Sequence, residues 1–120
     1  PGRQAAFEAE VDALIGPDVT REWVAIQPPV ETTFDGDLVD AMNAALLACD
    51  PDARTAPYML SGGTDAKAFA KLGIRCFGFA PLRLPPDLDF AALFHGVDER
   101  VPVDALEFGT RVLHHFLTHC

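Results

Sequence analysis

Apolar residues recur three and four positions apart in four segments of the chain, the spacing that places them on one face of a helix. The first segment stops before Pro17 and the second before Pro51, since proline cannot continue a helix. The third is closed by Gly73, and the last begins near Pro102. We expect these residues to face inward: Phe7, Val11, Leu14 and Ile15; Leu38, Met42, Ala45, Leu46 and Cys49; Phe69 and Leu72; Leu106, Gly109, Leu113 and Phe116.

Between these helices lie three short apolar runs that predict strands, at residues 20–27, 58–60 and 74–79. Helices that alternate with strands along a chain are typical of layered folds in which a parallel sheet is covered by helices. The fold class predicted from the sequence is therefore α/β, with part of a mixed or parallel sheet and flanking helices.

Two adjacent prolines, Pro28 and Pro29, mark the best candidate for a domain boundary. Because proline has no backbone N–H, this stretch can join neither a helix interior nor a central strand. The helix and the single strand before it cannot close a hydrophobic core alone. We therefore predict that residues 1–28 end a separate small domain whose earlier part is missing, and that residues 29–120 form a second domain.

Composition narrows the class of protein. The chain has 120 residues, of which 49% are hydrophobic and 22% charged, which suits a folded domain rather than a disordered one. No apolar run is long enough to cross a bilayer, so no membrane partner is expected. A net charge of −9 argues against nucleic acid. Three scattered cysteines suit reduced thiols and a cytoplasmic location, and the start at Pro1 suggests a processed or excised piece.

A glycine-rich turn is expected between the strand at 58–60 and the next helix. Residues 61–65, SGGTD, let the backbone turn tightly and expose its N–H groups beside a helix N-terminus. Such a turn can bind an anion such as a carboxylate, whereas phosphate is less favoured because no Walker sequence follows. A turn that only connects two elements is the simpler interpretation of these residues taken alone.

A histidine, His95, follows a long proline-rich loop at residues 81–89 and precedes the last helix. Loops of that length inside compact domains are often functional. Neutral imidazole is a good zinc ligand, and in the sequence FHGVDER a carboxylate three or four residues later could orient it. Taken alone, however, a single loop histidine is more often an ordinary polar residue.

The remaining histidines and the one serine give weaker signals. His115 and His119 are four residues apart, a spacing that can chelate a metal, but no HExxH pattern is present. The helix dipole alone favours histidine in a last turn, which is the simpler interpretation. Ser61 is the only serine of the chain, and it does not lie in a GxSxG elbow, which argues against a serine hydrolase.

Three segments taken together resemble one family. Their sequences are PPVETTFDGDLVDAM at 28–42, PYMLSGGTDAKAFAKLGIRCFGF at 57–79 and LFHGVDERVPVDALEFGTRVL at 93–113. They are similar to the C-terminal third of metallopeptidase family twenty, which includes aminoacylase, carboxypeptidase G, acetylornithine deacetylase and succinyl-diaminopimelate desuccinylase. The order and spacing of the segments make the resemblance specific.

The resemblance implies an α/β catalytic domain with two zinc ions, interrupted by a lid domain that often mediates dimerisation. Residues 1–28 would then end the lid and residues 29–120 would end the catalytic domain. His95 would be the late metal ligand, while Gly63 and Thr64 would hold the substrate carboxylate. Lys67 stands where relatives often have arginine, which puts a bidentate clamp there in doubt. The implied substrate is an N-acyl amino acid or small peptide, and cobalt or manganese would also suit a single imidazole.

The family's earlier ligands and its general base, an HxD segment, a Glu-Glu pair and a further acidic ligand, do not occur in this sequence. We therefore expect no catalytic residue in the segment, no hydrolase activity from it alone, and dependence on the remainder of a parent chain. A homodimer through the lid is expected. Two alternatives stay open: a noncatalytic α/β module kept for assembly or small-carboxylate binding, and a standalone anion-binding protein that uses the SGGT turn.

Overall fold

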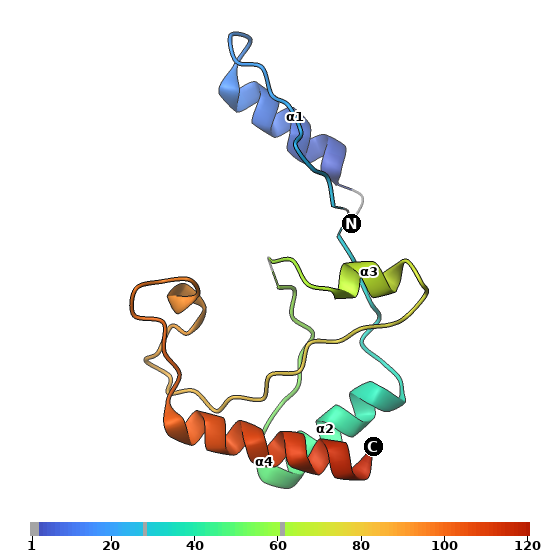
Figure 1. Cartoon of the computed structure of the whole chain (residues 1–120), viewed down its shortest axis with the longest axis vertical. Coiled ribbons are helices and arrows are strands. Elements are labelled where there is room, and N and C mark those ends of the chain that lie inside the picture. Colours follow the sequence, from blue (N-terminus) through green and yellow to red (C-terminus); the bar gives the residue numbers. More distant parts are fainter. Residues whose placement is uncertain (1–2, 28, 61) are drawn as a thin grey trace. The chain divides into compact units, whose positions relative to one another are not determined.

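The computed structural model of the protein describes residues 3–27, 29–60 and 62–120. Its helices are α1 (Gln4–Ile15), α2 (Asp37–Cys49), α3 (Ala66–Ala70), the 3-10 helix η1 (Ala91–Leu93) and α4 (Val103–His119), as Figure 1 shows. The predicted helices are therefore present, and α4 begins immediately after Pro102, as expected. None of the helices within these ranges is long and apolar enough to cross a membrane.

The predicted α/β fold class is wrong for the described residues, which form helices and no strand. The runs at 20–27, 58–60 and 74–79 are not helical, but none of them pairs with another. Across the described ranges, the backbone hydrogen bonds outside regular elements all close local turns. A strand exists only through the ladder that a neighbouring strand completes, so β-branched and aromatic runs without a partner remain extended chain.

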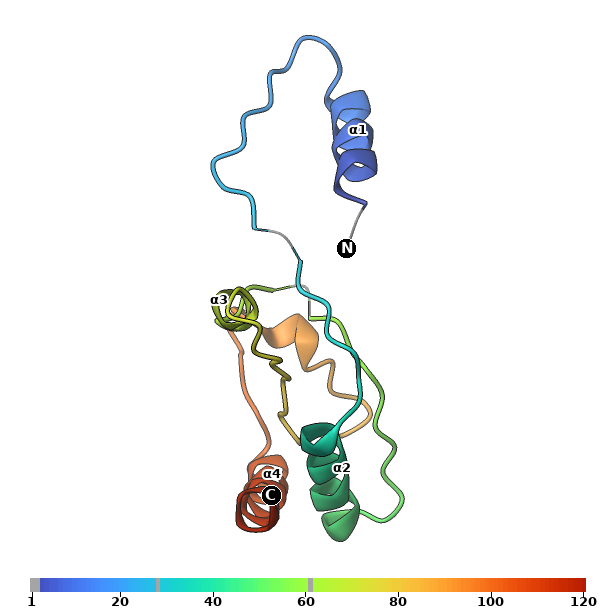
Figure 2. The same cartoon turned by 90° about the vertical axis from the view of Figure 1, so that its right-hand side faces the viewer.

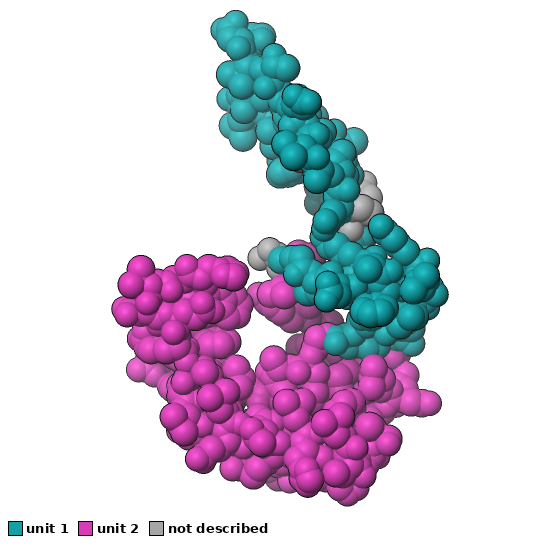
Figure 3. All heavy atoms as spheres, viewed as in Figure 1, with its two compact units in different colours: residues 1–33, 61–77 teal, residues 34–60, 78–120 magenta. Residues whose placement is uncertain are grey.

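Two groups of residues form separate compact units, coloured differently in Figure 3. Unit 1 comprises residues 1–33 and 61–77, and unit 2 comprises residues 34–60 and 78–120. The boundary predicted from the sequence falls on Pro28, which lies outside the described residues. The division into 1–28 and 29–120 therefore stays a prediction.

Unit 2 is built around a pair of helices, α2 and α4, which contact each other and lie side by side in Figure 2. Ala45 of α2 packs with Phe108 and Val112 of α4, and all three are buried. Phe79 and Phe116 extend this cluster through an edge-to-face contact of 5.6 Å between ring centroids. The side chains packed between these two helices form the hydrophobic core of the unit.

A close approach of the chain to α4 depends on Gly109. A Cβ atom at that position would lie 2.8 Å from the carbonyl oxygen of Pro81 and 3.4 Å from the Leu82 side chain. Glycine therefore lets the start of the proline-rich loop lie directly against the helix. The chain that follows this loop leads into α4, and it carries the turn that contains His95.

Unit 1 contains α1, whose predicted inward face is not buried. Phe7 and Leu14 are exposed and Val11 is half-buried, so the helix has no core of its own among the described residues. The helix ends at Gly16, which adopts a left-handed φ of 75°. This conformation is cheap for glycine, and it reverses the chain towards residues 17–24.

Candidate functional site

His95 lies in a compact series of turns that follows η1. Gly96 N–H donates to the carbonyl oxygen of Leu93 at 2.9 Å, and Glu99 N–H donates to that of Gly96 at 3.4 Å. The rings of Phe90 and Phe94 meet edge to face with centroids 5.2 Å apart. These local contacts fix the path of the backbone on both sides of His95.

The backbone of His95 is left-handed, with φ of 60°, and no other non-glycine residue in the described ranges has a positive φ. Histidine tolerates this region better than most residues, but it still costs roughly 1 kcal/mol. Gly96 helps to accommodate the turn, because a Cβ there would lie 3.1 Å from the Leu93 carbonyl oxygen. Strained non-glycine residues of this kind concentrate at functional sites.

The carboxylate of Glu99 stabilises the turn rather than the imidazole. Its Oε2 accepts a hydrogen bond of 3.2 Å from the backbone N–H of His95. The sequence predicts that a carboxylate at this distance along the chain could orient the imidazole ring. In the structure, the carboxylate instead bonds the backbone of His95. The His95 side chain is exposed, and its ring makes no hydrogen bond within residues 3–27, 29–60 and 62–120. The ring is therefore presented outward from a fixed backbone.

Gly63 and Thr64 lie in unit 1, before α3, and both are exposed. Thr64 contacts the first residues of α3: its Oγ1 accepts from the N–H of Ala66 at 3.3 Å, and its carbonyl oxygen accepts from Lys67 N–H at 3.2 Å. Asp65 makes no side-chain cap. A Cβ atom added to Gly63 would meet open space within 4 Å, so nearby atoms do not require glycine there. Ser61, the first residue of the SGGT sequence, lies outside the described residues.

Residues 5–119, which are nearly the whole chain, match the sequence model of Peptidase family M20/M25/M40. The chain belongs to this family. No curated protein matches it, and no solved structure matches it. The resemblance found in the sequence is thus confirmed at the level of the family, and with it the hydrolase and peptidase class; the match does not distinguish among the family's subgroups.

Family M20/M25/M40 peptidases are generally metal-dependent, which makes the placement of possible ligands important. In the parts of the chain that the structure describes, no group of three or more His, Cys, Asp or Glu side chains could hold an ion. A zinc site needs three or four protein ligands. The exposed imidazole of His95 could serve as a single ligand, and the described residues bring no further ligands together with it.

The ammonium group of Lys67 has a partner within unit 1. Its Nζ donates to Oε1 of Gln27 at 3.4 Å, which joins residues far apart in the sequence of unit 1. A lysine ammonium is a point charge without the planar fork of a guanidinium. Lys67 therefore holds the segment before Pro28 near α3, and its geometry offers no bidentate clamp.

The histidines at the end of α4 form a local arrangement. The rings of His115 and His119 stack with centroids 4.1 Å apart and planes 15° apart. Nδ1 of His119 lies 2.8 Å from the carbonyl oxygen of His115, which can only accept, so this nitrogen carries the proton. No third ligand joins the pair among the described side chains. The stack and this hydrogen bond join successive turns at the end of α4.

The sequence pattern did not reveal the best-formed ion pair of the described chain. Arg21 donates from Nε to Oδ1 of Asp12 and from Nη2 to Oδ2, both at 2.8 Å. The guanidinium also lies 4.8 Å from the ring of Trp23 and 4.0 Å from Glu8. The hydrogen bonds from Arg21 lower the pKa of Asp12, and those bonds raise the pKa of Arg21. The acidic residues at positions 8 and 12 share a helix face, which was the available signal.

Proposed function

We propose that this chain is a segment of a metal-dependent amidohydrolase that cleaves an amide bond of an N-acyl amino acid or a small peptide. Membership of Peptidase family M20/M25/M40 supports the hydrolase class. The observation that carries the proposal is the left-handed His95, whose backbone is fixed by Glu99 while its ring is exposed. An exposed imidazole on a fixed backbone leaves its ring nitrogens available to bind a metal ion, and strained residues cluster at functional sites.

His95 would supply one ligand to a two-zinc centre, with cobalt or manganese as other metals that a single imidazole suits. The remaining ligands and the general base would come from the remainder of the parent chain. When bound, such a metal pair provides an activated water and polarises the amide carbonyl. The contribution of the present residues is to fix the backbone from which the imidazole projects, through the Glu99–His95 hydrogen bond and the turn at Gly96.

Gly63 and Thr64 would bind the substrate's carboxylate as a separate element of unit 1. Both residues are exposed before α3, and the Thr64 hydroxyl accepts from the helix, so its proton stays available to donate. This role is tested by Thr64→Val, which keeps the shape and removes the hydroxyl. We expect a raised KM with little change in kcat, because the interaction would be made equally in ground and transition states.

The decisive experiment places His95→Ala in the longer polypeptide that carries the other ligands. We expect kcat/KM for an N-acyl amino acid to fall by about a thousandfold or more, with part of the bound zinc lost and circular dichroism unchanged. The matched control is His114→Ala, an exposed histidine on α4. Unchanged activity and metal content in the His95 variant would contradict the proposal.

The 120-residue chain alone is expected to be inactive and to bind zinc weakly. One imidazole cannot assemble a cocatalytic site, and the described residues bring no group of three ligands together. The measurement is hydrolysis of N-acyl amino acids with and without added zinc, together with zinc binding by calorimetry. An amidase activity that EDTA abolishes would contradict this prediction.

A second candidate function is a noncatalytic module kept for assembly or for binding small carboxylates. The exposure of large apolar side chains in unit 1 favours assembly, since Leu14 is 87% exposed and Val24 is 99% exposed. A homodimer through residues 1–28 would cover them. The free cysteines, Cys49, Cys76 and Cys120, support a reducing, cytoplasmic setting for either function.

A further inference from the structure

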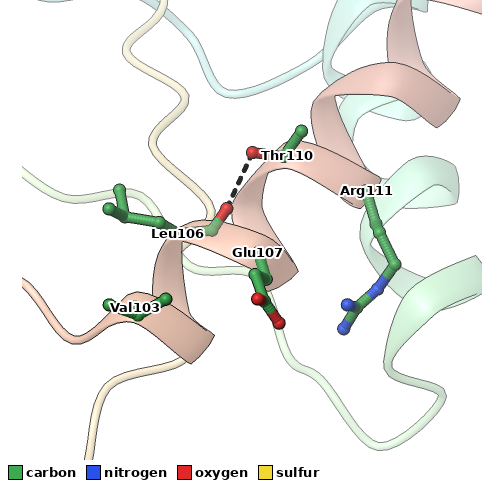
Figure 4. A pocket seen from close by; sticks show the side chains of 5 residues that line it. All are labelled: Val103, Leu106, Glu107, Thr110 and Arg111. Carbon is green, nitrogen blue, oxygen red and sulfur yellow. Dashed lines mark hydrogen bonds between the residues drawn. The ribbon is translucent and has the colours of Figure 1, made fainter.

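The turn that carries His95 is anchored by different means on its two sides. On the C-terminal side it leads into α4, where Leu106 N–H donates to the carbonyl oxygen of Pro102 at 3.2 Å. Figure 4 shows the first turns of α4 and a hollow along them, with Oγ1 of Thr110 donating to the carbonyl oxygen of Leu106 at 2.8 Å. This side of the turn is therefore held by a long helix that packs on α2.

On the N-terminal side, the turn follows the proline-rich loop at residues 81–89 and the short helix η1. A 3-10 helix of three residues has few hydrogen bonds of its own and needs support from its neighbours. Leu93, the last residue of η1, matters for the turn because its carbonyl oxygen accepts the Gly96 N–H at 2.9 Å. If η1 unravels, this acceptor moves, and the left-handed backbone of His95 loses its support on that side.

The side chain of Asp89 closes the start of η1. Its Oδ1 accepts a hydrogen bond of 3.2 Å from the backbone N–H of Ala92, one of the donors that the start of a helix leaves without a helical partner. The rings of Phe90 and Phe94, at the two ends of η1, meet edge to face with centroids 5.2 Å apart. One polar contact and one aromatic contact thus hold η1 between the loop and the turn.

We infer that Asp89 is a positioning residue for His95, acting through η1 and the Leu93 carbonyl group. This inference rests on the proposed role of His95 as a metal ligand. Two carboxylates fix the backbone around His95, Asp89 before it and Glu99 after it, and each accepts from a backbone N–H. Neither bond involves the imidazole, so Asp89 acts on the backbone from which the ring projects. Groups that orient a metal ligand in this way affect metal affinity and turnover without touching the metal.

Amide hydrogen exchange of the 120-residue chain, followed by NMR, tests the coupling without a metal. Asp89→Ala should speed exchange of the His95 and Gly96 amides by about tenfold, since both are hydrogen-bonded within the turn. Asp89→Asn should keep their protection, because asparagine caps a helix as well as aspartate does. The matched control is Asp87→Ala, which removes an exposed carboxylate from the same loop and should leave the exchange of both amides unchanged.

The longer polypeptide that carries the other metal ligands tests the consequence for the site. Asp89→Ala should lower kcat about tenfold with KM unchanged, and weaken zinc binding by a similar factor, because a displaced imidazole affects the metal rather than substrate binding. Asp89→Asn should restore both properties, and Asp87→Ala should leave both unchanged. With cobalt in place of zinc, the visible absorption bands should shift in Asp89→Ala, which a loss of stability alone would not cause.

Unchanged amide exchange in Asp89→Ala would overturn the inference whether or not His95 binds a metal. Faster exchange with unchanged kcat and zinc affinity would also overturn it, since η1 would then be ordered by Asp89 without consequence for the imidazole. In both cases His95→Ala decides the proposed function separately, because a loss of activity in that variant leaves the proposed function standing. Far-UV circular dichroism checks that each variant keeps α2 and α4.

Discussion

At the scale of single residues, the chain fixes His95 and Arg21 by different means. His95 is held through its backbone, by a left-handed turn and a hydrogen bond from its N–H to Glu99. Arg21 is held through its side chain, by a bidentate pair with Asp12 and a contact with Trp23. Local sequence indicates the first through the HGVDER pattern, but it does not indicate the second, which depends on how the chain turns at Gly16.

The Asp12–Arg21 pair should make the attachment of residues 17–24 to α1 sensitive to acid. The pKa of Asp12 is lowered below its usual value of 3.8 by hydrogen bonds from Arg21. A lowered pKa means that the contribution is fully present above the unfolded value and is lost as pH falls through the folded one. Because the pair is exposed, we expect a modest effect.

The measurement is Trp23 fluorescence, since Trp23 stacks with Arg21. The signal should stay constant at neutral pH and change only in acid, below the ordinary range of an aspartate. Asp12→Asn should show the acid signal already at about pH 7, because an amide carries no charge to titrate. Asp18→Asn, in the segment that follows α1, is the control. A wild-type transition near neutral pH would contradict the assignment to Asp12.

At the scale of elements, long helices are predictable from the sequence and short apolar runs are not. The helices α1, α2 and α4 span at least three turns each, so the recurrence of apolar residues is repeated several times and their presence is predictable. The apolar runs predicted as strands are short, and β propensity describes a surface that fits a sheet without specifying which chain will pair with it. Strand prediction therefore failed where no described partner exists.

The faces of the helices were only partly predictable for a related reason. Met42, Ala45 and Gly109 are buried as expected. Leu106 and Leu113, however, are exposed, and Phe108 and Val112 are buried in their place. Both sets in α4 have helical spacing, so periodicity alone cannot decide which one faces α2. The small side chains at Ala105 and Gly109 favour close packing on the observed face.

The contact between α4 and the chain at Pro81 gives a prediction for one element pair. Gly109→Ala should destabilise unit 2 by about 1–3 kcal/mol, because the added Cβ would lie 2.8 Å from a backbone oxygen. This loss should outweigh the gain of up to about 1 kcal/mol that alanine brings to a helix interior. Urea unfolding followed by far-UV circular dichroism measures it.

Gly63→Ala is the matched control for this experiment. A Cβ at position 63 would meet open space, and its backbone does not have a positive φ. The expected change is therefore within about 0.5 kcal/mol of zero, as for an ordinary surface substitution. Equal effects at the two glycines would argue that general chain flexibility, rather than the close approach to Pro81, governs the result at Gly109.

At the scale of the whole molecule, the described chain buries little apolar surface. Its buried hydrophobic residues are confined to α2 and α4, while large side chains such as Trp23, Tyr58 and Met59 remain exposed. Sequence composition predicts a sizeable core, because it counts apolar residues without counting the surfaces available to cover them. Family membership was predictable at this scale because widely separated motifs had to occur in one order, a condition that unrelated chains rarely meet.

At His95, the left-handed backbone and the proposed metal coordination favour different amino acids. The backbone accepts residues that tolerate positive φ, namely glycine, asparagine and aspartate, while coordination would accept an imidazole. In a saturation library at this codon, foldedness and catalysis should therefore rank the amino acids differently. Glycine would score among the best for abundance and among the worst for turnover, and valine would score poorly for both.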